Sequence, residues 1–348
     1  MPGRGLALIG RVWDGRVDPY DGVVIVGTDG LVAAAGPGLA IPEGVRVLHG
    51  GWVGPGIVDA HVHLAFGAPL DELRGGLVAV RDLGAPPAQA RAWQASDQLD
   101  IAVAGPILTA DGGYPSTSWG ADGFARFLGS PGECRAAVRD LVGDGVDLVK
   151  VALEPAGGLP VPTPQQVRAV VDAAHKAGLA VTAHALTVDM VQRVLDAGVD
   201  ELAHTPVEVL PASVVDRIAD SGLAVISTLQ TFYGAGVGHG AGINAAALVA
   251  AGVPLRYGTD LGNGGTRPGV DPRELDRLAD AGLGRDGALR TATAGSSAAY
   301  GLAGRVGDGT IRVGAVARLV LLDADPLVEP SAWMHPLAVV ARGDLVLP

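Results

Sequence analysis

The segment GIVDAHVHL, residues 56–64, begins with apolar residues and ends with an aspartate and two histidines. Its apolar half is typical of a strand that is buried on both faces, as in a parallel sheet. His61 and His63 are two positions apart, and alternate side chains of a strand point to the same side. We therefore expect the two imidazoles to face one spot at the end of a buried strand.

Apolar runs of the same kind recur along the chain and alternate with segments of helical period. Segments such as 164–178 and 189–199 place apolar residues at helical spacing and carry a Gly near their end. Eight strand–helix units predict an α/β fold, a closed (β/α)8 TIM barrel. A doubly wound open sheet is the alternative, although no Gly-rich phosphate loop follows the first strand. The predicted strands cover residues 56–62, 76–82, 100–109, 146–153, 179–184, 200–204, 223–229 and 254–260.

The two ends of the chain show a different pattern. Residues 1–50 and 308–348 contain alternating apolar runs with tight turns, such as the turn at residues 28–30. This pattern is typical of antiparallel strands. We expect both ends to form one small β-sandwich-like domain, and residues 51–307 to form the barrel.

Composition limits the classes of function. The chain has 348 residues, of which 48% are hydrophobic, so it can bury a large core. A net charge of −12 disfavours nucleic-acid or anionic-membrane partners. The N-terminus lacks the apolar run of a signal peptide, and no apolar segment reaches the roughly 18 residues of a membrane span. The one cysteine, Cys134, cannot form a disulfide framework. We therefore expect a cytoplasmic protein.

Polar residues stand at the ends of five predicted strands. They are His61 and His63, then Lys150, His184, His204 and Asp260. The carboxyl ends of barrel strands meet at one rim, where barrel enzymes carry their active sites. Histidine and carboxylate are common ligands of zinc and related ions. The sequence therefore predicts a metal centre at this rim.

Lys150 is the unusual member of this set, because it lies inside the apolar run VDLVKVAL. Burial disfavours an ammonium and leaves a free amine. A free amine can add carbon dioxide to give a carbamate, an anionic ligand with two oxygens that suits a pair of metal ions. A Schiff-base lysine of an aldolase-type barrel and a salt-bridged lysine are the alternatives.

These residues resemble the motifs of the amidohydrolase superfamily, in its binuclear subtype with a carboxylated lysine. The matching pieces are PGIVDAHVHL, VKVAL, TAHA, GVDELAHT and YGTD, and the tail GAVARLVLLDADPL also fits. GLVAVRDLG and RYGTDLGN are most similar to the branch of metal-dependent prolidases and imidazolonepropionase-like relatives. The resemblance covers essentially the whole chain.

The resemblance implies two divalent metal ions, most commonly zinc in this subtype, and a small-molecule substrate. His61, His63 and Asp260 would hold one ion, His184 and His204 the other, and carbamylated Lys150 would bridge them. A hydroxide between the ions would attack an amide, cyclic amide or ester, with Asp260 as general base. Related barrels often form homo-oligomers, which the sequence leaves open.

Three rival functions remain on the same barrel. A mononuclear deaminase of the superfamily would carry a Glu a few residues after His184, and residues 185–189 contain none. A metal-dependent isomerase or lyase would use the same ligands. A non-enzymatic binding protein would not need the complete set.

Residues that select the substrate are expected in the loops after the strands. Tyr114 stands where prolidase-like relatives often have a His after paired glycines, and this departure argues against dipeptide cleavage. Tyr233 and His239 lie in the glycine-rich segment 230–240, which we expect to be either a mobile lid or a solvated loop. Arg267 is a candidate for binding a carboxylate of the substrate.

Overall fold

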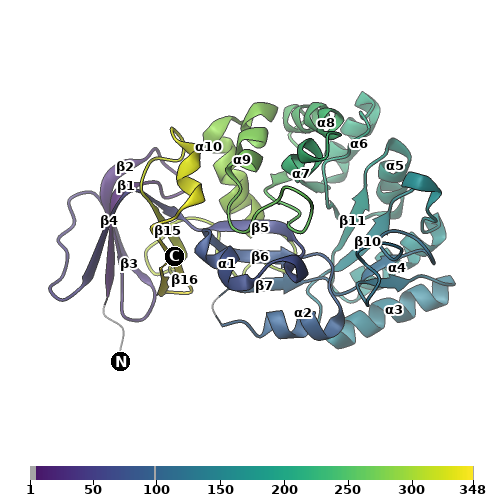
Figure 1. Cartoon of the computed structure of the whole chain (residues 1–348), viewed down its shortest axis with the longest axis horizontal. Helices are drawn as coiled ribbons and strands as arrows, with labels where there is room; N and C mark the ends of the chain where they lie inside the picture. The colour runs from purple at the N-terminus through teal and green to yellow at the C-terminus, as the bar shows by residue number, and fades with distance from the viewer. Residues whose placement is uncertain (1–4, 98, 348) are drawn as a thin grey trace.

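The computed structural model describes residues 5–97 and 99–347. The chain forms a barrel of parallel strands surrounded by helices, and a separate sheet built from both chain ends (Figure 1). In Figure 1 the purple N-terminal strands and the yellow C-terminal strands lie together at the left. The expected fold class, a TIM barrel with a terminal β domain, is confirmed.

The terminal sheet has seven strands in the order β17-β16-β15-β4-β1-β2-β3. It curls over a buried apolar cluster that includes Leu8, Val24 and Leu319. Hydrogen bonds of 2.9 Å from Val32 N to Ala315 O, and from Ala317 N to Gly30 O, hold the curled parts together. The strands are β1 (Leu6–Val12), β2 (Tyr20–Val26), β3 (Val32–Gly36), β4 (Arg46–Pro55), β15 (Leu319–Leu322), β16 (Ala338–Ala341) and β17 (Asp344–Val346).

The barrel closes between its first and last strands. Asp260 N donates to His61 O at 2.8 Å, and Ala60 N donates to Tyr257 O at 3.0 Å. Every pair of neighbouring barrel strands is parallel, so all carboxyl ends meet at one rim. The strands are β5 (Ile57–Val62), β6 (Leu77–Asp82), β7 (Asp100–Val103), β8 (Ile107–Thr109), β10 (Val149–Leu153), β11 (Val181–Ala185), β12 (Glu201–Leu202), β13 (Ala224–Ile226) and β14 (Leu255–Arg256).

The predicted strand 100–109 is broken in the structure, which corrects the sequence interpretation. Gly105 has a φ of 67°, and Pro106 has no N–H to donate to a strand ladder. Only the first half of the predicted strand, β7, therefore pairs with β6. The second half, β8, pairs with β10 and with an additional strand, β9 (Ala125–Phe127).

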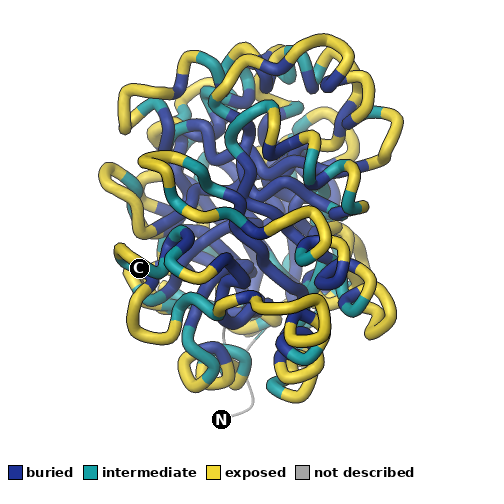
Figure 2. Tube along the Cα trace, turned by 90° about the vertical axis from the view of Figure 1, so that its right-hand side faces the viewer, coloured by how far each residue is buried: buried dark blue, intermediate teal, exposed yellow. Residues whose placement is uncertain are grey.

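Amphipathic helices cover the barrel strands. In α4, for example, Val167, Val170 and Ala174 lie on the buried face at helical spacing, and a capping box at Thr163 begins the helix. Figure 2 shows the buried strands in the middle of the barrel and exposed segments around them. The helices are α1 (Pro69–Arg74), α2 (Pro87–Gln94), α3 (Pro131–Asp144), α4 (Pro164–Lys176), α5 (Val188–Ala197), α6 (Ala212–Ser221), α7 (Leu229–Gly234), α8 (Gly238–Ala250), α9 (Pro272–Leu278) and α10 (Gly284–Arg290).

The segment 230–240 is largely helical, not the lid or solvated loop that its glycines indicated. It forms most of α7 and the start of α8. A Cβ on Gly238 would lie 2.6 Å from the ring of Tyr233, and one on Gly242 would lie 2.2 Å from the Tyr233 hydroxyl. These glycines therefore serve the close approach of α7 and α8.

Among the described residues, no helix combines the length and apolar character that crossing a membrane requires.

Candidate metal centre

The six residues predicted as metal ligands converge at the carboxyl ends of the barrel strands. Five of the side chains come from the end of a strand or from the residues that follow it, whereas Lys150 is the second residue of β10, and each residue is at most 7% exposed. The set is His61 from β5, His63 directly after β5, Lys150 from β10, His184 from β11, His204 after β12 and Asp260 after β14. The structure thus gathers these groups in one buried cluster.

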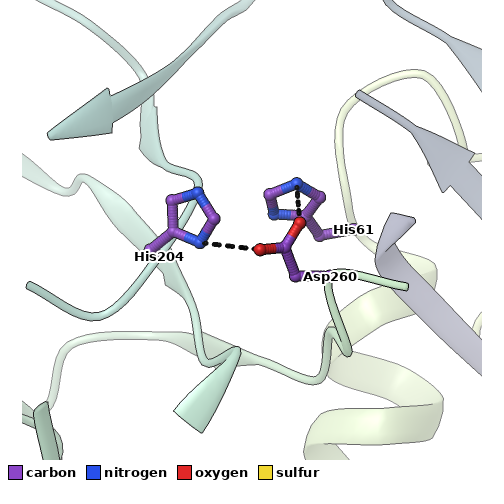
Figure 3. A group of neighbouring side chains, drawn as sticks. All are labelled: His61, His204 and Asp260. Atoms are coloured by element: carbon purple, nitrogen blue, oxygen red, sulfur yellow. Dashed lines mark ion pairs between the residues drawn. The ribbon is translucent and has the colours of Figure 1, made fainter. Parts of the chain in front are cut away.

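His61 is oriented by a backbone carbonyl. Its Nδ1 donates to Ala203 O at 2.9 Å, which leaves Nε2 without a proton in the neutral ring. Burial lowers the pKa of His61 to about 3, so the ring is neutral at physiological pH. The lone pair of Nε2 faces Asp260 Oδ1 at 3.1 Å (Figure 3). Two lone pairs that face each other repel, and a cation bound between them would remove this repulsion.

His63 completes a triangle of potential ligand atoms. Its Nε2 lies 3.4 Å from His61 Nε2 and 3.4 Å from Asp260 Oδ1. Ligands of a tetrahedral ion with bonds of about 2.0–2.1 Å stand about 3.3–3.4 Å apart. Three atoms from β5 and from the residues after β14 therefore already have the spacing of ligands of one divalent ion.

Asp260 joins this triangle to His204. Its Oδ2 lies 3.9 Å from His204 Nδ1, which also contacts Thr228 Oγ1 at 3.0 Å. Burial by itself raises the pKa of Asp260, but its contacts with His61 and His63 outweigh burial and hold that pKa well below the usual range. The carboxylate is therefore ionised and can serve as a ligand or accept a proton.

His184 is held by a carboxylate that the sequence analysis did not single out. Its Nε2 lies 2.9 Å from Glu154 Oε2, and Glu154 Oε1 accepts a hydrogen bond from Ala156 N at 2.8 Å. An ionised carboxylate can only accept, so Nε2 carries the proton and Nδ1 keeps its lone pair. The His184 ring lies 4.7 Å from the His204 ring, centroid to centroid. These two rings are the pair predicted as ligands of a second ion.

Lys150 lies within the same buried cluster. Burial lowers its pKa to about 7, with the nearby Asp260 acting in the opposite direction. Among the described residues, no hydrogen bond or ion pair holds its Nζ, although the residue is only 2% exposed. A buried amine without a fixed partner is available for addition of carbon dioxide.

Asp59 supports the cluster from behind. It accepts hydrogen bonds from His61 N at 2.9 Å and from the Thr259 hydroxyl at 2.7 Å. The first and last barrel strands, which carry His61 and Asp260, are therefore tied together beside the ligands.

Arg81 and Arg256 form a buried charge network inside the barrel. Both pair with Glu201, Arg81 by a short contact to Oε2 and Arg256 Nε at 3.1 Å from Oε1. Arg81 and Glu201 are fully buried, so Arg81 has a structural role inside the barrel.

The four candidate substrate residues lie in different surroundings. Tyr114 lies against the His184 ring at 5.0 Å. Tyr233 packs under the guanidinium of Arg277 at 3.9 Å, and His239 is exposed on α8. Arg267 donates to Val270 O at 2.5 Å within its own loop. Of the four, the structure places Tyr114 directly against a histidine that the sequence predicts as a metal ligand, and the substrate roles of all four stay predictions.

Glu154 and Thr228 are the site residues that sequence reasoning missed. Glu154 directly follows β10 and Thr228 lies two residues after β13, so the rule that polar residues at strand ends build the site would have found both. Their contacts with His184 and His204 depend on loop geometry that no local pattern reveals.

Comparison with known proteins finds a matching family model and proteins of similar sequence and fold. A model of the amidohydrolase family matches residues 71–346. An uncharacterised protein of Mycobacterium tuberculosis is 28% identical over 346 residues, covering 85% of this chain and 86% of that protein. Among solved structures, a putative prolidase from Bifidobacterium longum is 27% identical with a TM-score of 0.83, covering 99% of this chain and 94% of that one. A prolidase complexed with N-methylphosphonate-L-proline is 23% identical with a TM-score of 0.82, covering 99% of each chain.

Proposed function

The chain belongs to the amidohydrolase family, and from this premise we propose that it holds two zinc ions and hydrolyses an amide, cyclic amide or ester of a small molecule. The observation that carries this proposal is the triangle of His61 Nε2, His63 Nε2 and Asp260 Oδ1, whose atoms stand 3.1–3.4 Å apart. Imidazole nitrogens beside an ionised carboxylate are a donor set that suits zinc.

The ligands divide into two groups. His61, His63 and Asp260 hold the first ion, and His184 and His204 hold the second. The Lys150 amine adds carbon dioxide, forming an N–C bond and releasing a proton, and the resulting carbamate lies between the two groups. The lowered pKa of the Lys150 amine supports this assignment, as does the lack of a hydrogen-bond or ion-pair partner for that amine among the described residues.

Divalent metal ions bound at this site lower the pKa of water and polarise a carbonyl group. Asp260 takes the proton of the attacking water and delivers it to the leaving nitrogen or oxygen. The Tyr114 hydroxyl accepts a hydrogen bond from Trp119 Nε1 at 3.1 Å, so its own proton is free for the substrate's carbonyl oxygen. Burial raises the pKa of Tyr114, which keeps this donor protonated.

The experiment uses the fact that the chain has only two lysines, Lys150 and Lys176. Metal content is measured by elemental mass spectrometry on Lys150→Met, with Lys176→Met as the control because Lys176 is exposed at the end of α4. We expect two ions per chain in wild type and in Lys176→Met, and fewer in Lys150→Met. In ¹³C-bicarbonate, a carbamate NMR signal is expected to be lost only in Lys150→Met.

A single ion per chain in all three proteins, with no difference in the carbamate signal, would contradict the binuclear centre. A screen of amide, lactam and ester substrates follows, with ammonia release measured in parallel. Ammonia release from an amino-substituted ring would favour the deaminase alternative.

A further inference from the structure

Aromatic side chains gather over the metal centre although they are scarce in the chain. Phe, Trp and Tyr make up 4% of the residues, and three of the four Phe residues lie here. We call four of the rings the aromatic collar: Phe66 after β5, and Tyr114, Trp119 and Phe124 between β8 and β9.

The inner rings of the collar lie directly on metal-binding histidines. The Trp119 ring is 4.7 Å from the His63 ring, and the Tyr114 ring is 5.0 Å from the His184 ring, centroid to centroid. The two inner rings are joined by the Trp119–Tyr114 hydrogen bond. A substrate that approaches His63 or His184 on this side would therefore contact these rings.

The outer rings extend this surface toward solvent. Trp119 meets Phe66 and Phe124 edge to face at 5.7 Å, and Phe66 and Phe124 are nearly parallel, with 19° between their planes. Phe66 remains 48% exposed, and the other three rings of the collar are half-buried. An exposed aromatic group of this size beside a catalytic centre is typical of a binding surface.

Carboxylates lie next to the collar. Asp260 and Glu154 are close enough to Tyr114 for their charges to raise its pKa, in addition to the effect of burial. The bound ions of the proposed function would neutralise Asp260, but Glu154 is not a proposed ligand, and its negative charge would repel a negatively charged substrate group placed here. The collar therefore suits a neutral, apolar partner better than the free carboxylate of a dipeptide.

We propose that the aromatic collar selects substrates with a flat, uncharged, apolar group, such as a phenyl ring, next to the scissile amide or ester bond. This inference rests on the proposed hydrolase function and adds the substrate class. The flat group stacks against Trp119 and Phe66, while the carbonyl carbon reaches the metal centre.

The test compares three ethyl esters with the same leaving group: ethyl phenylacetate, ethyl acetate and monoethyl succinate. We expect kcat/KM to be at least about tenfold higher for the phenylacetate than for either of the others, since stacking with aromatic rings adds to the gain from burial. In Trp119→Ala, the ratio of phenylacetate to acetate is expected to fall about tenfold. Phe127→Ala is the control, because Phe127 is exposed on β9 outside the collar, and it should keep the wild-type ratio.

A binding measurement separates this inference from the proposed reaction. Phenylacetone, butanone and 4-oxopentanoate keep the carbonyl but have no leaving group, and their affinities for the zinc-loaded protein are measured by ligand-observed NMR. Phenylacetone should bind more tightly than the other two ketones, and Trp119→Ala should weaken its binding. This result would support the selective role of the collar even if no ester is hydrolysed and the hydrolase proposal fails. Preference for the anionic ester and ketone, or an unchanged ratio in Trp119→Ala with full metal content, would overturn it.

Discussion

Glu154 Oε2 lies 2.9 Å from Nε2 of His184, and both side chains are nearly buried, at 11% and 8% exposure. The contact directs the lone pair of the opposite ring nitrogen, Nδ1, away from Glu154. Carboxylates that hold the outer nitrogen of a metal-binding histidine fix its tautomer and raise its basicity. Glu154 is therefore a positioning residue for the second ligand pair.

Removing Glu154 should weaken metal binding without emptying the first ligand group. We expect Glu154→Ala to lower zinc affinity at one of two sites by about 10–100-fold, the usual effect of losing such a partner. Competition with a chromogenic chelator measures both affinities. Glu154→Gln keeps an oxygen acceptor and should lie between wild type and Glu154→Ala. Equal losses at both sites in Glu154→Ala would show a general disruption instead.

The buried network around Glu201 predicts a large effect on stability. Glu201→Gln would leave the guanidinium groups of Arg81 and Arg256 buried without a counter-charge. Breaking a buried pair in this way costs about 3–5 kcal/mol. Urea unfolding should show this loss, whereas Asp196→Asn, which removes an exposed pair with Arg217, should cost less than about 1 kcal/mol. Similar small losses in both variants would mean that the buried network contributes little.

The clustering of the candidate ligands could be predicted because it depends on each strand separately. A residue at the carboxyl end of a barrel strand reaches the shared rim wherever it lies along the chain, so His61, His184 and Asp260 could be assigned one strand at a time. The alternation of strand and helix likewise predicts the barrel, because the parallel sheet needs helices on its outer face.

What the sequence could not predict depends on contacts between distant segments. The glycines around Tyr233 indicate a loop when they are read alone, yet they allow α7 and α8 to approach closely. The break at Gly105 interrupts an apolar run that looks like one continuous strand, because the pattern of apolar residues does not determine the backbone φ angles. The contact of the Trp119 ring with the His63 ring likewise depends on how the loop before β9 folds back.

Metal removal should destabilise the protein. The potential ligand atoms of His61, His63 and Asp260 lie within 3.4 Å of one another only in the folded chain, so an ion bound there stabilises the folded state. At a free zinc concentration about 100 times the dissociation constant, the gain is about 2.7 kcal/mol. We expect dipicolinate to lower the Tm and added zinc to restore it, as followed by calorimetry. In His63→Ala, dipicolinate and zinc should change the Tm less than in wild type. A wild-type Tm that does not change when the chelator is added would argue against a metal centre.

Glu274 on α9 predicts a pH dependence of stability away from the metal centre. It is fully buried and accepts hydrogen bonds from Leu229 N at 3.0 Å and Gln230 N at 2.6 Å at the start of α7. Burial raises its pKa from 4.5 to about 7. The folded state therefore holds the proton more tightly than the unfolded chain, and this contribution is complete below pH 4.5 and lost as the pH rises through 7.

The loss amounts to about 3 kcal/mol, since each pKa unit corresponds to roughly 1.4 kcal/mol. Glu274→Gln cannot titrate, so its free energy of unfolding relative to wild type should rise by about this amount between pH 5 and pH 8. Urea unfolding across this range measures the difference and cancels the titration of the metal ligands, which both proteins share. Glu43→Gln, at an exposed loop position, should instead follow the wild-type profile at every pH. If the Glu274→Gln profile also runs parallel to wild type, the buried carboxyl does not take up a proton in this range.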